Sequence, residues 1–415
     1  MPTQQPRIAI VGGGPAGLTL GLLLHKRGIP FTVFELRQKP DEEELAKPSG
    51  MLDLHDGSGL TVIKECGLYD AFLPLTGECS EDFIVADRTG KILFVDKGEG
   101  GRPEISRNNL SKLLLSNLPS NSVKWGHKLL SAETLKSTAP ETSETELDFG
   151  SHGKHTFDLV VGADGAWSRV RRLLTDTKPY YTGMQIITLT IRHITKRYPH
   201  LANLIGSGSF TSLGNKHALV SQRGPLDSSR IYLWLTIPDQ DFPTISGLAD
   251  KPAASAQGVL LGDNKLLGTF GTPVKKLVAT ACDEDSAENP DANLDIRALY
   301  TLPHGLSWQH KPGVTIVGDA AHLMLPNGEG VNSAMFDSLL LSQAIIKAYE
   351  TAAKGTDSFQ SIFDPLLEES EAALIQRAKE TGKDTEDLIG KMFGSDDAAQ
   401  DFAGIFKSMV EQHSG

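Results

Sequence analysis

The residues of this chain most suited to chemistry form two glycine-containing segments near opposite ends of its 415 residues. The first is Gly12-Gly13-Gly14-Pro15-Ala16-Gly17, and the second is Gly318-Asp319-Ala320-Ala321-His322. A glycine-rich turn admits a phosphate group because the backbone can approach it without a Cβ atom. Each segment alone is a weak signal. Together they predict that both ends of the chain hold one dinucleotide.

The first segment lies in the context of a dinucleotide-binding βαβ unit. Residues 7–11 have the composition of a short buried strand, and residues 18–27 that of a helix ended by Gly28. Residues 31–35 are expected to form the next strand. A glycine-rich turn between such a strand and helix is a stronger signal than the glycines alone. We therefore favour a dinucleotide-binding turn over a glycine-rich turn without a ligand.

Several residues of this unit have a clear physical task. Gly12 permits the tight turn, and Gly14 lets the backbone approach a pyrophosphate. Gly17 lets the helix and the strand pack closely, and the helix N-terminus offers N–H groups to the phosphates. Glu35 ends the second strand, where it can accept hydrogen bonds from ribose hydroxyls. These residues do not distinguish NAD from FAD.

The second segment resembles a known signature. Residues 318–326, followed by Gly-Glu-Gly-Val-Asn at residues 328–332, are similar to the signature of class A flavoprotein aromatic hydroxylases, the para-hydroxybenzoate hydroxylase type. The resemblance implies that the cofactor is FAD, that Asp319 binds its ribityl or ribose hydroxyls, and that a helix from Gly330 points at the flavin pyrimidine. A helix N-terminus stabilises the negative charge of a reduced flavin. Asn332 adds a polar contact there, or it is an ordinary residue of the first helical turn.

A third segment, residues 158–165, ends in Ala-Asp-Gly and is followed by Ser168 and Arg169. It resembles the Asp-Gly motif of the same family, which is linked to both FAD and NAD(P)H binding, and it adds Asp164 to the cofactor residues. The alternative is a strand followed by a common Asp-Gly turn. Three motifs in the family's order favour the family.

Two more segments narrow the resemblance. Residues 52–59, Leu-Asp-Leu-His-Asp-Gly-Ser-Gly, and residues 103–110, Pro-Glu-Ile-Ser-Arg-Asn-Asn-Leu, look like the tetracycline-inactivating flavin monooxygenases and their fungal and bacterial relatives. By that resemblance Arg107 contacts FAD and Asp53 lies beside the cofactor. His55 is either part of the site or an ordinary polar loop residue.

The chain departs from the family at two places. The family has an arginine directly after the ribose-binding acid, whereas here Leu36 follows Glu35 and the arginine is Arg37. The family also has one more residue between the proline and the Gly-x-Gly, whereas only Asn327 follows Pro326 here. That loop lies against the substrate in relatives. We therefore expect an individual substrate pocket beside a standard cofactor site.

These motifs predict two sets of residues. The cofactor set is Gly12, Gly14, Ala16, Gly17, Glu35, Leu36, Arg37, Asp53, Arg107, Asp164, Asp319, Gly330, Val331 and Asn332. The substrate set is Gln185, Tyr232, Trp234, Met324 and Pro326, although Tyr232 and Trp234 are equally consistent with a core. No catalytic acid or base and no metal ligand can be assigned.

The resemblance implies an FAD-dependent monooxygenase. We therefore expect NADPH or NADH to reduce FAD and O2 to form a C4a-hydroperoxyflavin, which would hydroxylate a polycyclic aromatic, phenolic or enolic small molecule, tetracycline-like or a polyketide. One alternative is an FAD-dependent reductase or oxidase of the same fold without oxygen transfer. Another is a flavin-binding protein with a regulatory task.

The expected fold is α/β. A Rossmann-like FAD-binding domain is formed by residues 1–70, 102–175 and 296–350. A mainly antiparallel β-sheet domain for the substrate is inserted as residues 71–101 and 176–295, and helices follow at residues 360–415. The alternating pattern of the strands at residues 184–193 and 231–237 supports a sheet with two different faces. The resemblance is thin between Thr175 and Asp295, the region expected to select the substrate.

Some local expectations are independent of the motifs. Residues 83–95 read as a hairpin, and residues 131–146 as an exposed hairpin or loop. The acidic run at residues 41–44 and the breakers at residues 47–50 predict a solvated loop. The arginines at residues 169–172 are expected on a helix. An apolar stripe in the last helix is expected to pack on the body; its members are Phe402, Ile405, Phe406 and Met409.

Composition and charge limit the possible partners and location of the protein. A formal net charge of −12 argues against nucleic acid or an anionic membrane surface as the main partner. The three cysteines, Cys66, Cys79 and Cys282, are too few and scattered for a disulfide framework or zinc cluster. Residues 1–6 do not resemble a secretory signal. Glycines interrupt the apolar run at residues 8–24 too often for a membrane span. We expect a cytoplasmic monomer whose partners are an aromatic small molecule and O2.

Overall fold

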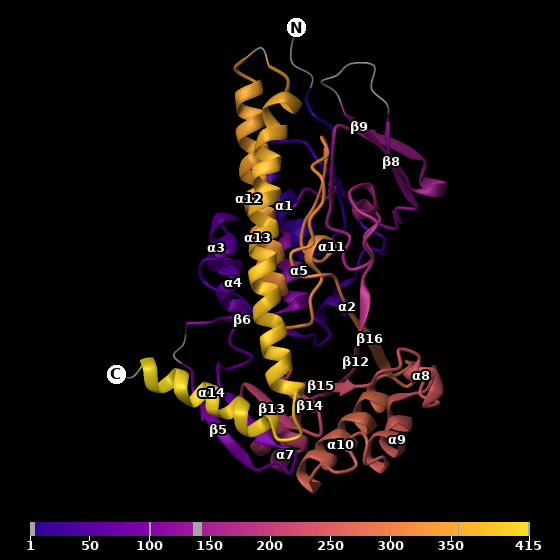
Figure 1. Cartoon of the computed structure of the whole chain (residues 1–415), viewed down its shortest axis with the longest axis vertical. Helices are drawn as coiled ribbons and strands as arrows, with labels where there is room; N and C mark the ends of the chain where they lie inside the picture. The colour runs from indigo at the N-terminus through magenta and orange to yellow at the C-terminus, as the bar shows by residue number, and fades with distance from the viewer. Residues whose placement is uncertain (1–4, 99–100, 136–142, 356, 414–415) are drawn as a thin grey trace.

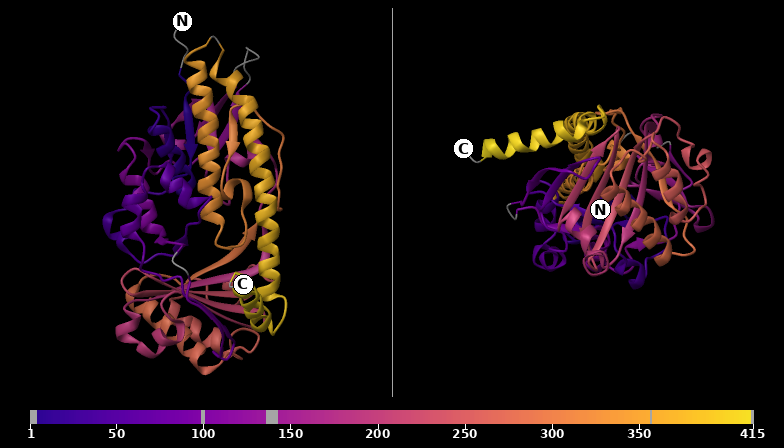
Figure 2. Two further views of the ribbon diagram at one scale, coloured as in Figure 1. Left: turned by 90° about the vertical axis from the view of Figure 1, so that its left-hand side faces the viewer. Right: turned by 90° about the horizontal axis from the view of Figure 1, so that it is seen from below.

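The structure is a computed structural model that describes residues 5–98, 101–135, 143–355 and 357–413, without the side chains of residues 409–413 (Figure 1). Figure 2 shows an upper part built around a parallel sheet and a lower part built around a broad sheet, with long helices beside them. This confirms the α/β fold class.

The upper sheet is parallel, and its central strands are buried. Its order is β17-β11-β1-β2-β7. Its strands are β1 (Ile8–Val11), β2 (Thr32–Phe34), β7 (Val123–Lys124), β11 (Leu159–Gly162) and β17 (Val314–Ile316). Every residue of β1 and β11 is buried, which is expected for central strands with helices on both faces. Helices α1 (Pro15–His25) and α12 (Gly330–Ala352) pack against each other and contribute to the same core.

The lower sheet has seven strands in the order β16-β12-β15-β14-β13-β4-β5. All its neighbours are antiparallel except β13 and β4. The strands are β4 (Phe83–Asp87), β5 (Ile92–Asp96), β12 (Tyr180–Ile191), β13 (Ser209–Gly214), β14 (His217–Gly224), β15 (Ser228–Thr236) and β16 (Asp295–Thr301). The hairpin expected at residues 83–95 is therefore confirmed.

The two faces of this sheet bury different clusters. Ile187, Leu189 and Leu233 pack on the helical layer of α7 (Pro199–Ile205), α9 (Ala256–Gly262) and α10 (Thr272–Glu288). Ile186 and Trp234, which point the other way, share a core with the C-terminal helices. Period-two alternation thus separates a structural face from a face turned toward the rest of the molecule.

The C-terminal helices join the two parts. Helix α13 (Phe359–Phe393) runs beside α12 and continues down to the lower sheet, where α14 (Ala398–His413) turns across β4, β5 and β13 (Figures 1 and 2). Phe402 and Phe406 pack against Phe83, so this part of the expected apolar stripe packs on the body. The side chain of Met409 lies outside the described residues.

Smaller elements complete the fold. Two-stranded and three-stranded sheets are formed by β3 (Met51–Asp53), β6 (Glu104–Ser106), β8 (Ser131–Leu135), β9 (Glu144–Asp148) and β10 (Lys154–Phe157). The short α-helices are α2 (Glu42–Ala46), α3 (Gly59–Glu65), α4 (Tyr69–Phe72), α5 (Arg107–Ser116), α6 (Ile194–Arg197), α8 (Phe242–Ile245) and α11 (Asp319–His322). The 3-10 helices are Leu73–Leu75, Gly150–His152, Val170–Leu173 and Ala253–Ser255. Residues 131–146 form the β8 and β9 arms of a hairpin, with residues 136–142 outside the description.

Two local expectations need correction. The acidic run after Asp41 forms helix α2, because the Asp41 side chain accepts a hydrogen bond from the Glu44 N–H (2.7 Å) and caps the helix. Of the arginines after Asp164, Arg171 and Arg172 lie on a 3-10 turn, Val170–Leu173, and Arg169 directly precedes it, so no extended helix forms there. The domain boundaries stay a prediction, and the limit drawn between residues 295 and 296 falls inside β16. No helix of the described ranges is long and apolar enough to cross a membrane.

Candidate active site

The two glycine segments meet in space. Gly318 has a φ of +60°, and a Cβ atom there would lie 3.0 Å from the Cβ of Ala334 on α12 and 3.6 Å from that of Ala16 on α1. The Ser338 hydroxyl on α12 donates to the Ala16 carbonyl (2.9 Å). The ends of the chain therefore form one surface, as the motifs predicted.

The glycines of the first segment serve different purposes. Gly12 has a φ of +114°, and a Cβ there would lie 2.1 Å from the Ala163 carbonyl oxygen. A Cβ on Gly17 would lie 2.0 Å from the Gly12 carbonyl oxygen, so both positions require glycine for packing. A Cβ on Gly14 would meet no atom within 4 Å. Gly14 therefore borders open space at the N-terminus of α1, where a phosphate can approach.

Glu35 binds the backbone of this turn. Its buried carboxylate accepts hydrogen bonds from the N–H groups of Gly13 (2.7 Å) and Arg37 (2.9 Å). The Arg37 side chain is 80% exposed and lies 3.4 Å from the Glu35 carboxylate, and Leu36 is 60% exposed. Both residues predicted after the acid thus lie at the surface beside it. A carboxylate keeps further acceptor capacity for ribose hydroxyls.

Asp319 and Arg107 lie close enough to interact electrostatically, and the surface between them is called the recess below. Asp319 is exposed to solvent, yet surrounding protein raises its pKa by burial, against the attraction of His322 and Arg107. Arg107 begins α5, and its N–H donates to the Gly50 carbonyl (2.9 Å). Within the described residues no hydrogen bond or ion pair is recorded for its exposed guanidinium. A carboxylate and a cation thus face one recess, which suits hydroxyl and phosphate groups.

Asp164 is held by its own segment. Its carboxylate accepts hydrogen bonds from the Ser168 hydroxyl (2.5 Å) and from the N–H groups of Arg169 (2.7 Å) and Val170 (3.3 Å). The nearby Arg171 guanidinium donates to the Ala320 carbonyl (2.9 Å). The Asp-Gly segment is therefore tied to the second glycine segment, and the role of Asp164 at a cofactor stays a prediction.

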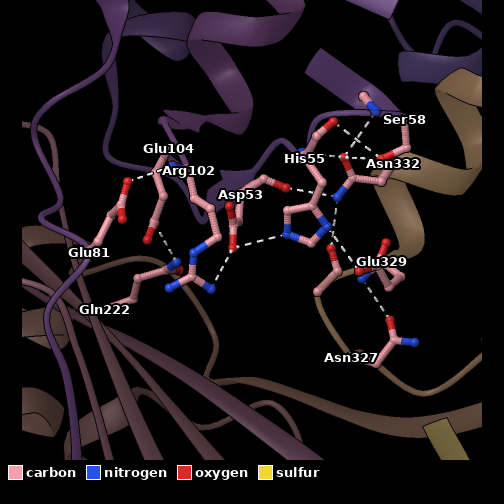
Figure 3. A network of polar contacts seen from close by, with 12 residues as sticks. Asp53, His55, Ser58, Glu81, Arg102, Glu104, Gln222, Asn327, Glu329 and Asn332 are labelled. Atoms are coloured by element: carbon pink, nitrogen blue, oxygen red, sulfur yellow. Dashed lines mark hydrogen bonds and ion pairs between the residues drawn. The ribbon is translucent and has the colours of Figure 1, made fainter. Parts of the chain in front are cut away.

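Asn332 fastens the start of α12 to the loop after β3. Its fully buried side chain donates to the Asp53 carbonyl (2.8 Å) and accepts from the N–H groups of His55 (3.0 Å) and Gly59 (3.2 Å) (Figure 3). These bonds occupy the amide. Asn332 thus fixes Gly330 and Val331, the predicted cofactor residues before it, and a direct contact of its own with a cofactor stays a prediction.

His55 lies between two acids in the same place. Its Nε2 is 3.2 Å from Asp53 Oδ2 and its Nδ1 is 2.9 Å from Glu329 Oε1 (Figure 3). Hydrogen bonds with Asp53 and Glu329 raise the pKa of His55 to about 10. Arg102 lies 3.8 Å from the same Asp53 oxygen. The second Asp53 oxygen, Oδ1, is buried and has no hydrogen-bond partner among the described residues, which fits a donor supplied by a ligand.

Glu104 lies directly across the β3–β6 pair from Asp53. It is 9% exposed and accepts a hydrogen bond from the Gln222 amide of the lower sheet (2.8 Å). Burial and the neighbouring Asp53 charge raise the pKa of Glu104 to about 7. Glu104 therefore links the two parts of the molecule and titrates near neutrality.

Tyr232 brings the lower sheet to this recess. A Cβ atom on Gly50 would lie 2.6 Å from the Tyr232 hydroxyl, so the phenol lies against the loop that also receives the Arg107 N–H. Trp234, two residues along the same face, is 7% exposed and stacks on Phe393 of α13 at 6.0 Å between ring centroids. The Tyr232 hydroxyl therefore lies beside the loop that contacts Arg107, whereas Trp234 forms part of a core.

The other predicted substrate residues separate into two groups. Leu325 and Tyr232 pack against the same cluster, which contains Trp234, so Met324 and Pro326, the neighbours of Leu325, lie near that cluster; Pro326 is exposed. Gln185 pairs with Leu235 and points to the opposite face, where its amide donates to the Gln240 carbonyl (3.1 Å). The structure does not bring Gln185 together with the rest, because side chains alternate along β12. Gln185 is therefore not a neighbour of Tyr232.

The residues present fit a flavin dinucleotide. Open space before Gly14, the exposed Arg107 opposite Asp319, and the unpartnered Asp53 oxygen supply places for phosphates, hydroxyls and a ring N–H. Gly318 lies close to Ala16, at the start of α1, and to Ala334, in the second turn of α12. Among the described residues no group of histidines, cysteines and acids could hold a metal ion.

The parallel sheet, the glycine turn with its acid and the Gly-Asp segment define an FAD-binding oxidoreductase of the class A monooxygenase type. The chain belongs to the FAD binding domain family, whose model matches residues 6–241 and 306–361. It is 36% identical to "Monooxygenase penA" of Penicillium thymicola over 437 residues, which cover 98% of this chain and 99% of that protein. The protein is an FAD-dependent monooxygenase.

Solved structures share the fold. Klebsiella pneumoniae HpxO complexed with FAD and uric acid matches with a TM-score of 0.72 at 17% identity, covering 98% of this chain and 94% of that one. The tetracycline destructase Tet(55) matches with a TM-score of 0.60 at 18% identity, covering 95% and 98%. The family model and the fungal relative together confirm the family expected from the sequence motifs.

Sequence reasoning missed part of the polar network. Glu329 and Glu104 both lie inside motifs quoted for the resemblance, but neither was given a role. A hint was available in their residue type, since an acid inside a glycine-rich loop or a buried strand needs a partner. The partners, His55 and Gln222, are distant in sequence and only the fold reveals them.

Proposed function

We propose that the protein hydroxylates a polycyclic aromatic, phenolic or enolic small molecule, tetracycline-like or a polyketide, with NAD(P)H as reductant and O2 as the second substrate. When bound, FAD takes hydride from the nicotinamide and activates dioxygen for transfer of one atom. The family and the similarity to a fungal monooxygenase support this proposal.

The observation that carries the proposal is the meeting of an aromatic sheet face with the cofactor recess. The Tyr232 hydroxyl lies against Gly50, and the Gly50 carbonyl accepts the Arg107 N–H. A planar substrate placed there would have an apolar wall on one side, from Tyr232 and Leu325, and the cofactor recess on the other. Such a wall excludes water from the reacting centre.

The test is product analysis with a panel of polycyclic phenols. We expect some members to stimulate NAD(P)H consumption and to yield products that have gained one oxygen atom. Tyr232→Ala should raise the KM for such a substrate severalfold without loss of FAD, whereas Tyr180→Ala, at an exposed tyrosine of β12, should not. Consumption that yields only hydrogen peroxide with every stimulating compound would instead favour a reductase or oxidase.

A further inference from the structure

His55 connects two carboxylates from separate elements. Asp53 is the last residue of β3, and Glu329 directly precedes Gly330, the first residue of α12. Each ring nitrogen of His55 faces one of these carboxylates, at 3.2 Å and 2.9 Å. An imidazole can donate from both nitrogens only when it is protonated, so the imidazolium is the form that serves two ionised carboxylates at once.

Each of the two acids that contact His55 has a cation beside it, and Glu104, opposite Asp53, adds negative charge when it is ionised. Arg102 accompanies Asp53 at 3.8 Å, and His55 accompanies Glu329 (Figure 3). Without the imidazolium, a carboxylate would remain uncompensated at the N-terminus of α12. A helix N-terminus attracts one anion, and an acid held there competes with any second anion.

The backbone of Glu329 is held by contacts that do not involve His55. Its N–H donates to the Asn327 side chain (2.8 Å), and the Asn327 amide in turn donates to Thr385 of α13 (2.5 Å). Asn327 therefore stabilises the loop from Pro326 to Gly330 internally and attaches it to α13. Without the His55 ring the Glu329 backbone would stay at the helix start, so its half-exposed carboxylate would keep its charge within one side-chain length of that N-terminus.

The imidazole ring is not needed to attach the loop. Asn332 already binds the Asp53 carbonyl (2.8 Å) and the backbone N–H groups of His55 (3.0 Å) and Gly59 (3.2 Å). These contacts involve the backbone of the loop and persist whatever side chain stands at position 55. The ring contributes its charge and its two bonds to acids.

We propose that His55 is a positioning residue that neutralises Glu329 and thereby keeps the N-terminus of α12 favourable for the anionic, reduced form of the cofactor. The proposal rests on the proposed function, because it requires FAD beside the start of α12. A positive charge that stabilises the reduced form more than the oxidised form raises the midpoint potential of a bound flavin.

The experiment measures the midpoint potential of FAD bound to the full chain in four forms: wild type, His55→Gln, Glu329→Gln and the double variant. His55→Gln should weaken binding of reduced relative to oxidised FAD about tenfold, which lowers the potential by about 30 mV for a two-electron couple. Glu329→Gln should shift it in the opposite direction, and the double variant should return toward wild type. Asp56→Asn, at a surface carboxylate paired with Lys64 (2.8 Å), is the matched control and should leave it unchanged.

Opposite signs distinguish charge compensation from loosening of the loop, which would move both single variants the same way and overturn the proposal. Equal potentials in all four FAD-bound forms would also overturn it, while the proposed function stands. A wild-type chain that binds no FAD would contradict both. Should His55→Gln fail to fold, the sign of the Glu329→Gln shift decides alone: a raised potential supports the proposal and an unchanged one overturns it.

Discussion

The Nε2 atom of His322 lies 2.6 Å from the Asp337 Oδ2 atom, and both side chains are buried. Asp337 belongs to α12, and His322 closes the second glycine segment. The same carboxylate accepts hydrogen bonds from the Gly318 N–H (3.2 Å) and the Arg377 guanidinium on α13 (3.1 Å). One buried acid therefore ties the predicted FAD-binding segment to both long helices.

Asp337→Asn should destabilise the protein. It leaves the His322 and Arg377 side chains without their anion, and loss of one partner of a buried ion pair costs about 3 kcal/mol. Chemical denaturation should show this fall in the free energy of unfolding, accompanied by weaker FAD retention. Asp401→Asn, at an exposed position of α14, is the control. Equal unfolding free energies for the two variants would contradict the account of Asp337.

Glu104 should make stability depend on pH. The folded-state pKa of Glu104, about 7, lies above the ordinary value of 4.5 because of burial and the Asp53 charge. A raised carboxyl pKa gives stability that is complete below the unfolded value and is lost as pH rises through the folded value. We expect wild type to lose about 3 kcal/mol between pH 4.5 and pH 8 relative to Glu104→Gln.

The Glu104→Gln comparison uses thermal or denaturant unfolding across that pH range. The neutral amide keeps an acceptor for Gln222, so the difference reports the charge rather than a lost hydrogen bond. Parallel stability curves for wild type and variant would show that Glu104 does not titrate in this range.

Asp319→Asn should weaken FAD binding about tenfold, since hydrogen bonds to a charged acceptor contribute about 1.5 kcal/mol. The apo protein should unfold as wild type does, because Asp319 lines the recess and no hydrogen bond is recorded for its side chain among the described residues. Flavin content after gel filtration and titration with FAD measure the effect. Unchanged flavin content would show that the recess is not the cofactor site.

Gly50→Ala should destabilise the contact between the lower sheet and the loop at Gly50. The added methyl would lie 2.6 Å from the Tyr232 hydroxyl, an overpacking that costs about 1–3 kcal/mol. Tyr232→Phe removes the clashing oxygen, so the Gly50→Ala/Tyr232→Phe double variant should recover much of the loss. Thermal unfolding of the three variants measures this coupling. Purely additive effects would place Tyr232 away from Gly50.

The parallel sheet and the meeting of the two glycine segments could be predicted because local motifs determine them. Helix α2 was missed since one side chain, Asp41, caps it where composition indicated a loop. The orientation of Gln185 depends on its register opposite Leu235 across β12 and β15, which the sequence of either strand does not reveal. The His55–Glu329 contact joins distant segments and follows only from the folded chain.

Reaction of the FAD-loaded protein with NAD(P)H and isotopically labelled dioxygen tests the central claim most directly. With a polycyclic phenol that stimulates NAD(P)H consumption, we predict a product carrying one labelled oxygen atom, formed in proportion to the reductant consumed. Consumption coupled entirely to hydrogen peroxide, with the phenol recovered unlabelled, would contradict the assignment as a monooxygenase of such compounds.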